Sequence, residues 1–254
     1  MLSLAAAVAA VLETDFVFSN ETAALVHGLN VYGLTEAVHV CQGSKPAGRQ
    51  APDPYLRRHP IAVPDRDRAV VSGRPVTTVE RTMVDCARWL PGPRALVVAD
   101  SALRAGADLE IVARLLDEAA GKPGVQQARR IVEVSDVRAE SAGESLVRWF
   151  VLEAGLGAVE LAIESPTRRG RYWVDLGWPA LKVGVEFDGL VKYSGGRFGD
   201  PRERLLAEKR RHDALTEAGW ILVHVTWDDL RDPAALVARI RAALATGHRR
   251  RATR

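Results

Sequence analysis

The sequence has few cysteines and no long apolar run. Its 254 residues include two cysteines, Cys41 and Cys86, which are too few for a disulfide framework and lack the spacing of a zinc site. Both lie in apolar surroundings, so we expect buried free thiols and a reducing cytoplasm. No apolar stretch approaches the roughly 18 residues of a membrane helix. The apolar residues 2–12 lack the basic start of a signal peptide, so we expect no membrane partner.

Motifs of several large enzyme classes are also missing. The chain has no GxGxxG motif, no P-loop, no GxSxG elbow and no HExxH helix, and its six histidines form no local Ser/His/Asp arrangement. The composition, with 47% hydrophobic and 26% charged residues, is typical of a globular protein. The length allows one large domain or two small ones.

The basic excess lies in the second half of the chain. Residues 1–137 hold 15 Lys and Arg against 16 Asp and Glu, a balance of −1. Residues 138–254 hold 20 against 16, a balance of +4, and the two balances add to the net charge of +3. A local basic excess favours a polyanionic partner for the second half.

The chain divides near residue 138 into two segments of different character. Apolar periodicity and turn residues predict, for the first segment, helices 2–12 and 19–28, strands 36–42, 55–58 and 68–73, a turn at Gly73-Arg74-Pro75, and helices beginning near 77, 95, 108 and 123. For the second they predict helix 141–155, strands 159–165, 172–178 and 183–189, helix 200–218, strand 220–227, and a helix opened by Asp232. We expect residues 247–254 to form a basic, frayed tail. The order α-β-β-β-α-β-α predicts an α/β (α+β) fold for the second segment.

Two predicted strands of this segment carry acids where strands favour Val or Ile. Asp175 lies within YWVDLGW, and Glu186 and Asp188 lie within VGVEFDG. A short turn joins these strands, so we expect an antiparallel pair that sets Asp175 beside Glu186. Glu186 and Asp188 are two residues apart and therefore share a face. Clustered carboxylates are what Mg²⁺ binds together with substrate phosphates, so Asp175, Glu186 and Asp188 are the predicted ligands of Mg²⁺ or Mn²⁺. Such a metal assists hydrolysis of a phosphodiester.

Residues 138–246 resemble the Vsr-like branch of the PD-(D/E)XK, or restriction-endonuclease-like, superfamily. The match rests on ESLVRWFVLEAG, YWVDLGWP, VEFDG and RRHDALTEAGWILVHVTWDDL. The resemblance implies an αβββαβ nuclease core with a central mixed sheet, and catalytic roles for Glu144, Asp175, Glu186 and Asp188. This chain has Asp188 where the wider superfamily has lysine. Lys192 stands where many relatives have histidine, and the resemblance makes it a catalytic, DNA-contacting cation.

Each of these residues also has a structural interpretation. Glu144 completes a Ser-x-x-Glu capping box, and Asp188 precedes a glycine and suits a turn. Asp175 suits the end of an edge strand, and Lys192 suits a solvated surface. Two arginines of the next helix are predicted DNA contacts that also suit a solvated helix face, namely Arg210 and Arg211. Two histidines are expected to be structural, namely His212 and His224.

The first half carries a second, looser resemblance. FVFSNETAALVHGL and PVTTVERTMVDCARWL are similar to the AbiEi-type antitoxins of type IV toxin–antitoxin systems. In those proteins a winged helix precedes this region, whereas here Met1 stands almost directly before it. We therefore expect residues 1–137 to lack a complete winged helix, and helix 19–28 to be a packed helix. This resemblance implies a DNA-binding regulator with a cognate toxin as its partner.

Three functions follow from these patterns. The first is a metal-dependent DNA endonuclease, and the second is a non-catalytic DNA-binding regulator, either of which allows a homodimer. The third is a structural interaction module, favoured if the acids pair with Arg168, Arg169 or Lys182. The first two differ in whether the three carboxylates converge within metal-bridging distance and open to solvent.

Overall fold

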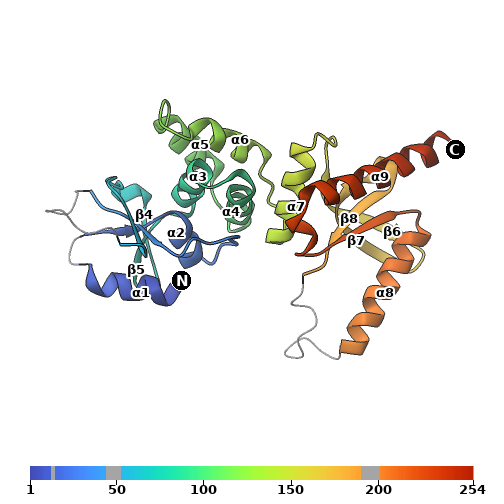
Figure 1. The fold of residues 1–254 in the computed structure, drawn as a ribbon, viewed down its shortest axis with the longest axis horizontal. Coiled ribbons are helices and arrows are strands. Elements are labelled where there is room, and N and C mark those ends of the chain that lie inside the picture. The colour runs from blue at the N-terminus through green and yellow to red at the C-terminus, as the bar shows by residue number, and fades with distance from the viewer. Residues whose placement is uncertain (13–14, 44–52, 190–200, 254) are drawn as a thin grey trace. The chain divides into compact units, whose positions relative to one another are not determined.

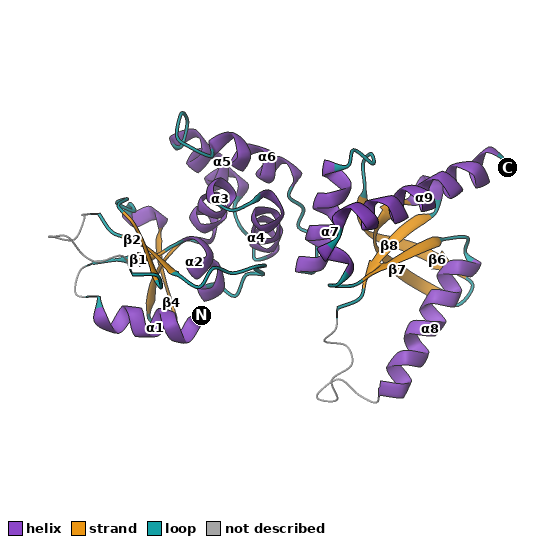
Figure 2. Cartoon of the chain, viewed as in Figure 1, coloured by secondary structure: helices purple, strands orange, loops and turns teal. Residues whose placement is uncertain are grey.

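The computed structural model describes residues 1–12, 15–43, 53–189 and 201–253, with side chains from residue 206 onward in the last of these ranges. The chain forms two compact units, Met1–Ala142 and Gly143–Arg254. The division lies close to the expected position near residue 138. Each unit has its own sheet and helices, so the chain is of the α/β class (Figure 1 and Figure 2).

The first unit contains a five-stranded sheet in the order β3-β2-β1-β5-β4. The strands are β1 (Val17–Phe18), β2 (Val38–Cys41), β3 (Leu56–His59), β4 (Arg68–Val71) and β5 (Arg74–Thr77). Helix α1 (Leu2–Val11) contributes Ala5 and Val8 to a core that contains Phe18 of β1. Helix α2 (Asn20–Val26) adds Ala23 to the same core, so the small apolar side chains of α1 and α2 close over the sheet.

Four helices complete this unit, and their starts agree with the sequence. They are α3 (Val79–Trp89), α4 (Gly92–Arg104), α5 (Leu109–Glu118) and α6 (Val125–Val134). Thr78 caps α3 by accepting from the Arg81 backbone N–H, and Asp108 caps α5 by accepting from that of Glu110. Cys41 and Cys86 are free and buried, as expected.

The second unit has the expected element order around a sheet β6-β7-β8-β9. Its elements are α7 (Ala142–Glu153), β6 (Glu160–Thr167), β7 (Gly170–Trp178), a 3-10 turn η2 (Pro179–Leu181), β8 (Val183–Phe187), α8 (Pro201–Glu217), β9 (Ile221–Val225) and α9 (Pro233–Ala252). Strands β6, β7 and β8 are antiparallel and β9 is parallel to β8, which makes the sheet mixed, with β8 buried in its interior.

Helices α8 and α9 pack on opposite sides of β8. Gly184 points toward Trp220, which belongs to the core formed with Leu215 of α8. The preceding residue, Val183, contacts Gly247 of α9. Since neighbouring strand residues point to opposite faces, Glu186, two residues beyond Gly184, belongs to the α8 side.

Two expectations about the elements are wrong, and one strand was missed. Strand β1 was not predicted, because two residues are too short for a periodic signal. The expected turn at Gly73-Arg74-Pro75 lies one residue earlier: Ser72 and Gly73 have φ of 50° and 75°, so β5 begins at Arg74. The basic tail is also not frayed, because α9 continues to Ala252. In the described residues no helix is long and apolar enough to cross a membrane.

Candidate functional site: a carboxylate cluster held by an arginine and a histidine

Glu186 is the buried centre of the candidate site. It lies in β8, every residue of which is buried, and its own exposure is 3%. The Nη2 atom of Arg211, on α8, donates to its Oε1 at 2.7 Å. Burial raises the pKa of Glu186 above its usual value, and the Arg211 guanidinium opposes that shift. The charges of Asp175 and Asp188 raise it further, so Arg211 is the main group that favours the ionised form of Glu186.

Asp175 lies beside Glu186, as predicted. The β7–β8 ladder runs from Trp178 and Val183 to Leu176 and Val185, so Asp175 and Glu186 are the next residues on the two strands. There the Oδ2 atom of Asp175 accepts from the Phe187 backbone N–H at 2.8 Å. An aspartate therefore suits this strand position because its side chain receives a backbone donor that a Val or Ile would leave unpaired.

Arg211 joins the two acids from α8. Besides Glu186, its Nη2 donates to the backbone carbonyl of Trp173 at 2.8 Å and lies 3.7 Å from Oδ1 of Asp175. A single guanidinium nitrogen therefore faces three oxygens of β7 and β8. The predicted role of Arg211 was contact with nucleic acid, whereas its contacts in this structure are with the carboxylates. Arg210, the residue before it, is exposed.

Asp188 joins the cluster through His224. The Nδ1 atom of His224 lies 3.1 Å from Oδ2 of Asp188 and 4.0 Å from Oε2 of Glu186. The parallel β8–β9 pairing sets His224 directly beside Glu186, which explains these contacts. Its Nε2 in turn lies 3.1 Å from Nδ1 of His212 on α8. Asp188, His224 and His212 thus form a chain of hydrogen-bonding groups that leads away from the buried Glu186.

His224 and His212 were expected to be structural, and the structure places both at the site. One signal was available for His224, because it is an imidazole within the apolar run WILVHVTW. The sequence does not reveal that β9 pairs with β8 in the register that sets His224 beside Glu186. Lys192, the other predicted cation, lies outside the described residues, so its role stays a prediction.

Glu144 lies at the same end of β8 as the cluster. It is in the first turn of α7 and is 9% exposed. The preceding residue, Gly143, packs against the ring of Phe187, so closely that a Cβ atom there would lie 2.1 Å from Cε1. Phe187 also meets Trp227 edge-on, with ring centroids 5.0 Å apart. These contacts bring the start of α7 to the strand end that carries Glu186 and Asp188.

The donor set of the cluster suits a divalent cation in its chemistry. Asp175, Glu186 and Asp188 offer hard oxygen ligands, and His224 offers a nitrogen that Mn²⁺ also accepts. In the arrangement described, however, Arg211 stands among the oxygens. No group of three or more His, Cys, Asp or Glu in the described ranges is arranged to hold a metal ion. A metal would therefore take over the oxygens that Arg211 now contacts.

Comparison with known proteins places the chain in a family. No family model matches it. It is 34% identical over 225 residues to the uncharacterized proteins MT2308 and Rv2248 of two Mycobacterium tuberculosis strains, CDC 1551 / Oshkosh and ATCC 25618 / H37Rv, with 86% of this chain and 78% of each relative covered. The crystal structure of the RV2827C protein from Mycobacterium tuberculosis aligns with a TM-score of 0.36 and 18% identity, over 58% of this chain and 57% of that one. By its match to MT2308 and Rv2248, this chain belongs to the same protein family as those two mycobacterial proteins.

Proposed function

We propose that the second unit is a metal-dependent endonuclease of the Vsr-like PD-(D/E)XK kind, which hydrolyses phosphodiester bonds of DNA in the cytoplasm. One observation carries the proposal: Asp175 and Glu186, on adjacent strands, share Arg211, while Asp188, just past the end of β8, contacts His224, which lies 4.0 Å from Glu186. Such convergence costs free energy through charge repulsion and burial, and structural need alone explains it poorly.

Each residue has a defined part in this proposal. Asp175, Glu186 and Asp188 would hold Mg²⁺ or Mn²⁺. When bound, that ion stabilises negative charge on the phosphodiester and lowers the pKa of a coordinated water. The chain itself positions the ligands: the Phe187 N–H orients Asp175, and His224 orients Asp188. Glu144 lies at the same strand end as a further acid, and Lys192 is proposed as a cation for the substrate phosphate.

Plasmid cleavage tests the proposal directly. The purified full chain is incubated with supercoiled plasmid in Mg²⁺ or Mn²⁺, beside Asp175→Asn and Glu186→Gln. Loss of a metal ligand is expected to lower cleavage by about 100-fold or more. The control is Glu164→Gln, which removes an exposed acid of β6 that pairs with Arg171 away from the cluster. Equal cleavage by the wild type and both site variants would refute the assignment.

A second function is favoured by the position of Arg211. Its guanidinium already neutralises Glu186, so the carboxylate has a cation without any metal. This arrangement suits a non-catalytic DNA-binding regulator of the AbiEi antitoxin type. That protein would bind DNA without metal, and a cognate toxin would be its partner. Calorimetric titration with Mn²⁺ separates the two: the nuclease binds the ion and Glu186→Ala loses that binding, whereas the regulator binds none.

For the third function, a structural module, the described residues show no ion pair between the acids of the cluster and Arg168, Arg169 or Lys182. It required Arg168, Arg169 or Lys182 to pair with the acids of the cluster. Arg169 pairs instead with Glu217, and Lys182 lies over the ring of Trp220. The observed partners, Arg211 and His224, bring the acids together and do not separate them.

A further inference from the structure

A basic groove lies at the end of β8 opposite the carboxylate cluster. It has a volume of about 350 Å³ and lies between η2, the turn before β9 and the last turns of α9, where Lys182, Arg250 and Arg251 line it. A second hollow of about 550 Å³ shares Lys182 and is lined also by Arg168. Lys182 therefore stands where the two hollows meet.

The groove is formed by close packing of α9 on the β7–β8 turn. A Cβ atom at Gly247 would lie 2.9 Å from the Leu181 carbonyl oxygen and 2.9 Å from Val183. Glycine at this position lets the basic end of α9 approach the turn. On the turn, Lys182 adopts a left-handed φ of 52°, and its Nζ lies 5.1 Å from the centre of the Trp220 ring. The backbone packing thus fixes where these cations emerge.

Among the described residues, no carboxylate forms an ion pair with Lys182, Arg250 or Arg251, and no acid lines the groove. Nearby arginines differ, since Arg169 pairs with Glu217 and Arg239 with Asp229. Arg250 and Arg251 are exposed, so their charge is available to a partner.

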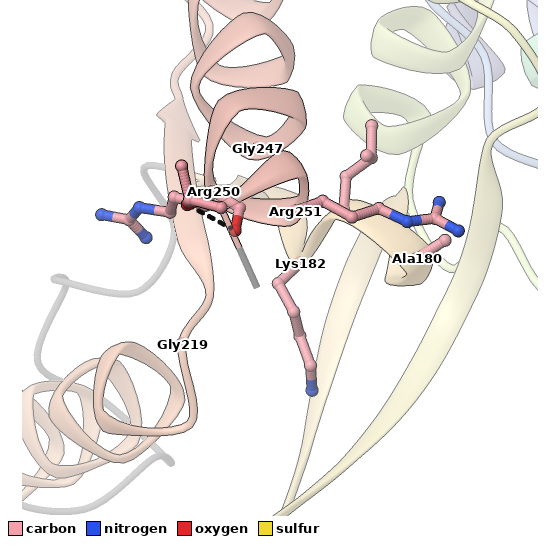
Figure 3. A pocket seen from close by; sticks show the side chains of 8 residues that line it. Ala180, Lys182, Gly219, Gly247, Arg250 and Arg251 are labelled. Carbon is pink, nitrogen blue, oxygen red and sulfur yellow. Dashed lines mark hydrogen bonds between the residues drawn. The ribbon is translucent and has the colours of Figure 1, made fainter.

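The three cationic side chains point in different directions. Figure 3 shows Lys182 extending away from α9, with Arg250 and Arg251 reaching to either side of the helix. Groups that converge on one point would suit a single phosphate ion. Groups that spread in this way suit a chain of negative charges, such as the phosphate backbone of a nucleic acid, which carries a charge every 3.4 Å or so of each strand.

We propose that Lys182, Arg250 and Arg251 bind the phosphate backbone of DNA. The choice of DNA over another polyanion rests on the proposed nuclease function. The arrangement of the three cations is observed independently of that proposal. Glu186 lies four residues along β8 from Lys182, which corresponds to roughly 13 Å. That distance equals the length of about four nucleotides of one DNA strand. The groove holds the DNA, and the far end of β8 carries the chemistry.

Binding measured without metal tests this proposal. Fluorescence anisotropy of a labelled DNA duplex of about 20 base pairs is recorded with the full chain in EDTA, from 50 to 200 mM KCl. We compare the wild type with Lys182→Ala/Arg250→Ala/Arg251→Ala. If all three residues contact phosphates, the slope of log K against log salt becomes less negative by about 2.7, and affinity at low salt falls at least tenfold.

Two variants control for net charge and for folding. The first removes three exposed cations of the first unit by Arg57→Ala/Arg104→Ala/Lys122→Ala and is expected to bind within about twofold of the wild type. The second, Lys182→Arg/Arg250→Lys/Arg251→Lys, keeps every charge and is expected to bind as the wild type does. An equal loss in the first control and the groove variant overturns the proposal, and so does undiminished binding by the groove variant.

Competitors and site variants separate this proposal from the others. Displacement of the duplex by inorganic phosphate at matched ionic strength would show a pocket for single anions. Equally tight binding of polyglutamate would show an acidic protein surface as the partner, and either result overturns the assignment to DNA. Asp175→Asn retains binding if the groove acts as proposed. Binding without cleavage would refute the nuclease alone, and cleavage with unchanged binding in the groove variant would refute the groove alone.

Discussion

Removal of Arg211 tests the electrostatic design of the site. Glu186 has a side chain only 4% exposed, and the Arg211 side chain that neutralises it is 27% exposed. Arg211→Ala leaves a buried carboxylate without its nearest cation. Breaking a buried pair from one side costs about 3–5 kcal/mol when both groups are fully buried. Because Arg211 is partly in water, we expect a loss of about 2–3 kcal/mol in the free energy of unfolding at pH 7.

A double-mutant cycle shows whether the loss belongs to the pair. Glu186→Gln keeps the side-chain shape and removes the charge, so we expect it to cost at most about 1 kcal/mol. In Glu186→Gln/Arg211→Ala no buried charge is left unpaired, and most of the loss should disappear, which gives a coupling energy of about 2 kcal/mol. The cost of Arg211→Ala should also shrink toward pH 4.5. Burial raises the pKa of Glu186, so this carboxyl takes up a proton at a higher pH than an exposed glutamate does, and its protonated form needs no cation.

Urea unfolding followed by tryptophan fluorescence is a suitable assay. Five of the six tryptophans lie after residue 142, so the signal reports mainly on the second unit. The reasoning is refuted if Arg211→Ala costs less than about 0.5 kcal/mol. It is also refuted if the double variant is no more stable than Arg211→Ala. A Mn²⁺ titration of Arg211→Ala extends the test: tighter binding than in the wild type shows that the guanidinium and a metal compete for the same oxygens.

Three further predictions concern backbone packing and pH. Gly143→Ala should destabilise the second unit by about 1–3 kcal/mol, measured by the same urea assay, because its Cβ would lie 2.1 Å from the Phe187 ring. Gly177→Ala should cost a similar amount, because its Cβ would lie 2.3 Å from the Val183 carbonyl oxygen; wild-type stability in either variant contradicts the packing. Burial and His59 lower the pKa of His39 from 6.5 to about 4, so the folded first unit favours the neutral imidazole. The resulting stabilisation is fully present above pH 6.5, and about 3 kcal/mol of the free energy of unfolding is lost as the pH falls toward 4. Urea unfolding followed by circular dichroism should show a smaller loss of stability over that pH range for His39→Gln than for the wild type. An equal loss in the two proteins would refute this role of His39.

Local sequence patterns predicted most of the second unit. Turn residues and apolar runs are short-range signals, and they located β6, β7, β8 and β9 and the flanking helices. The same reasoning predicted that β8 is interior, because an uninterrupted apolar run suits a strand covered on both faces. The pairing of Asp175 with Glu186 followed from the short β7–β8 connection, which restricts two strands to an antiparallel hairpin. Elements too short for a period, such as β1, were missed.

The side chains that contact these carboxylates could not be located in this way. Arg211 and His224 reach Glu186 only because α8 crosses the sheet on the Gly184 side and β9 pairs with β8 in one particular register. A shift of that register by one residue would move His224 to the opposite face. The positions of carboxylates on one hairpin are therefore set by local sequence, whereas the positions of the side chains that contact them depend on tertiary packing. Arg211 occupies the carboxylate oxygens that a metal would need, so the acids on the paired strands mark only the position of the proposed metal site. Mn²⁺ binding by the wild type and by Arg211→Ala tests whether that site accepts a metal.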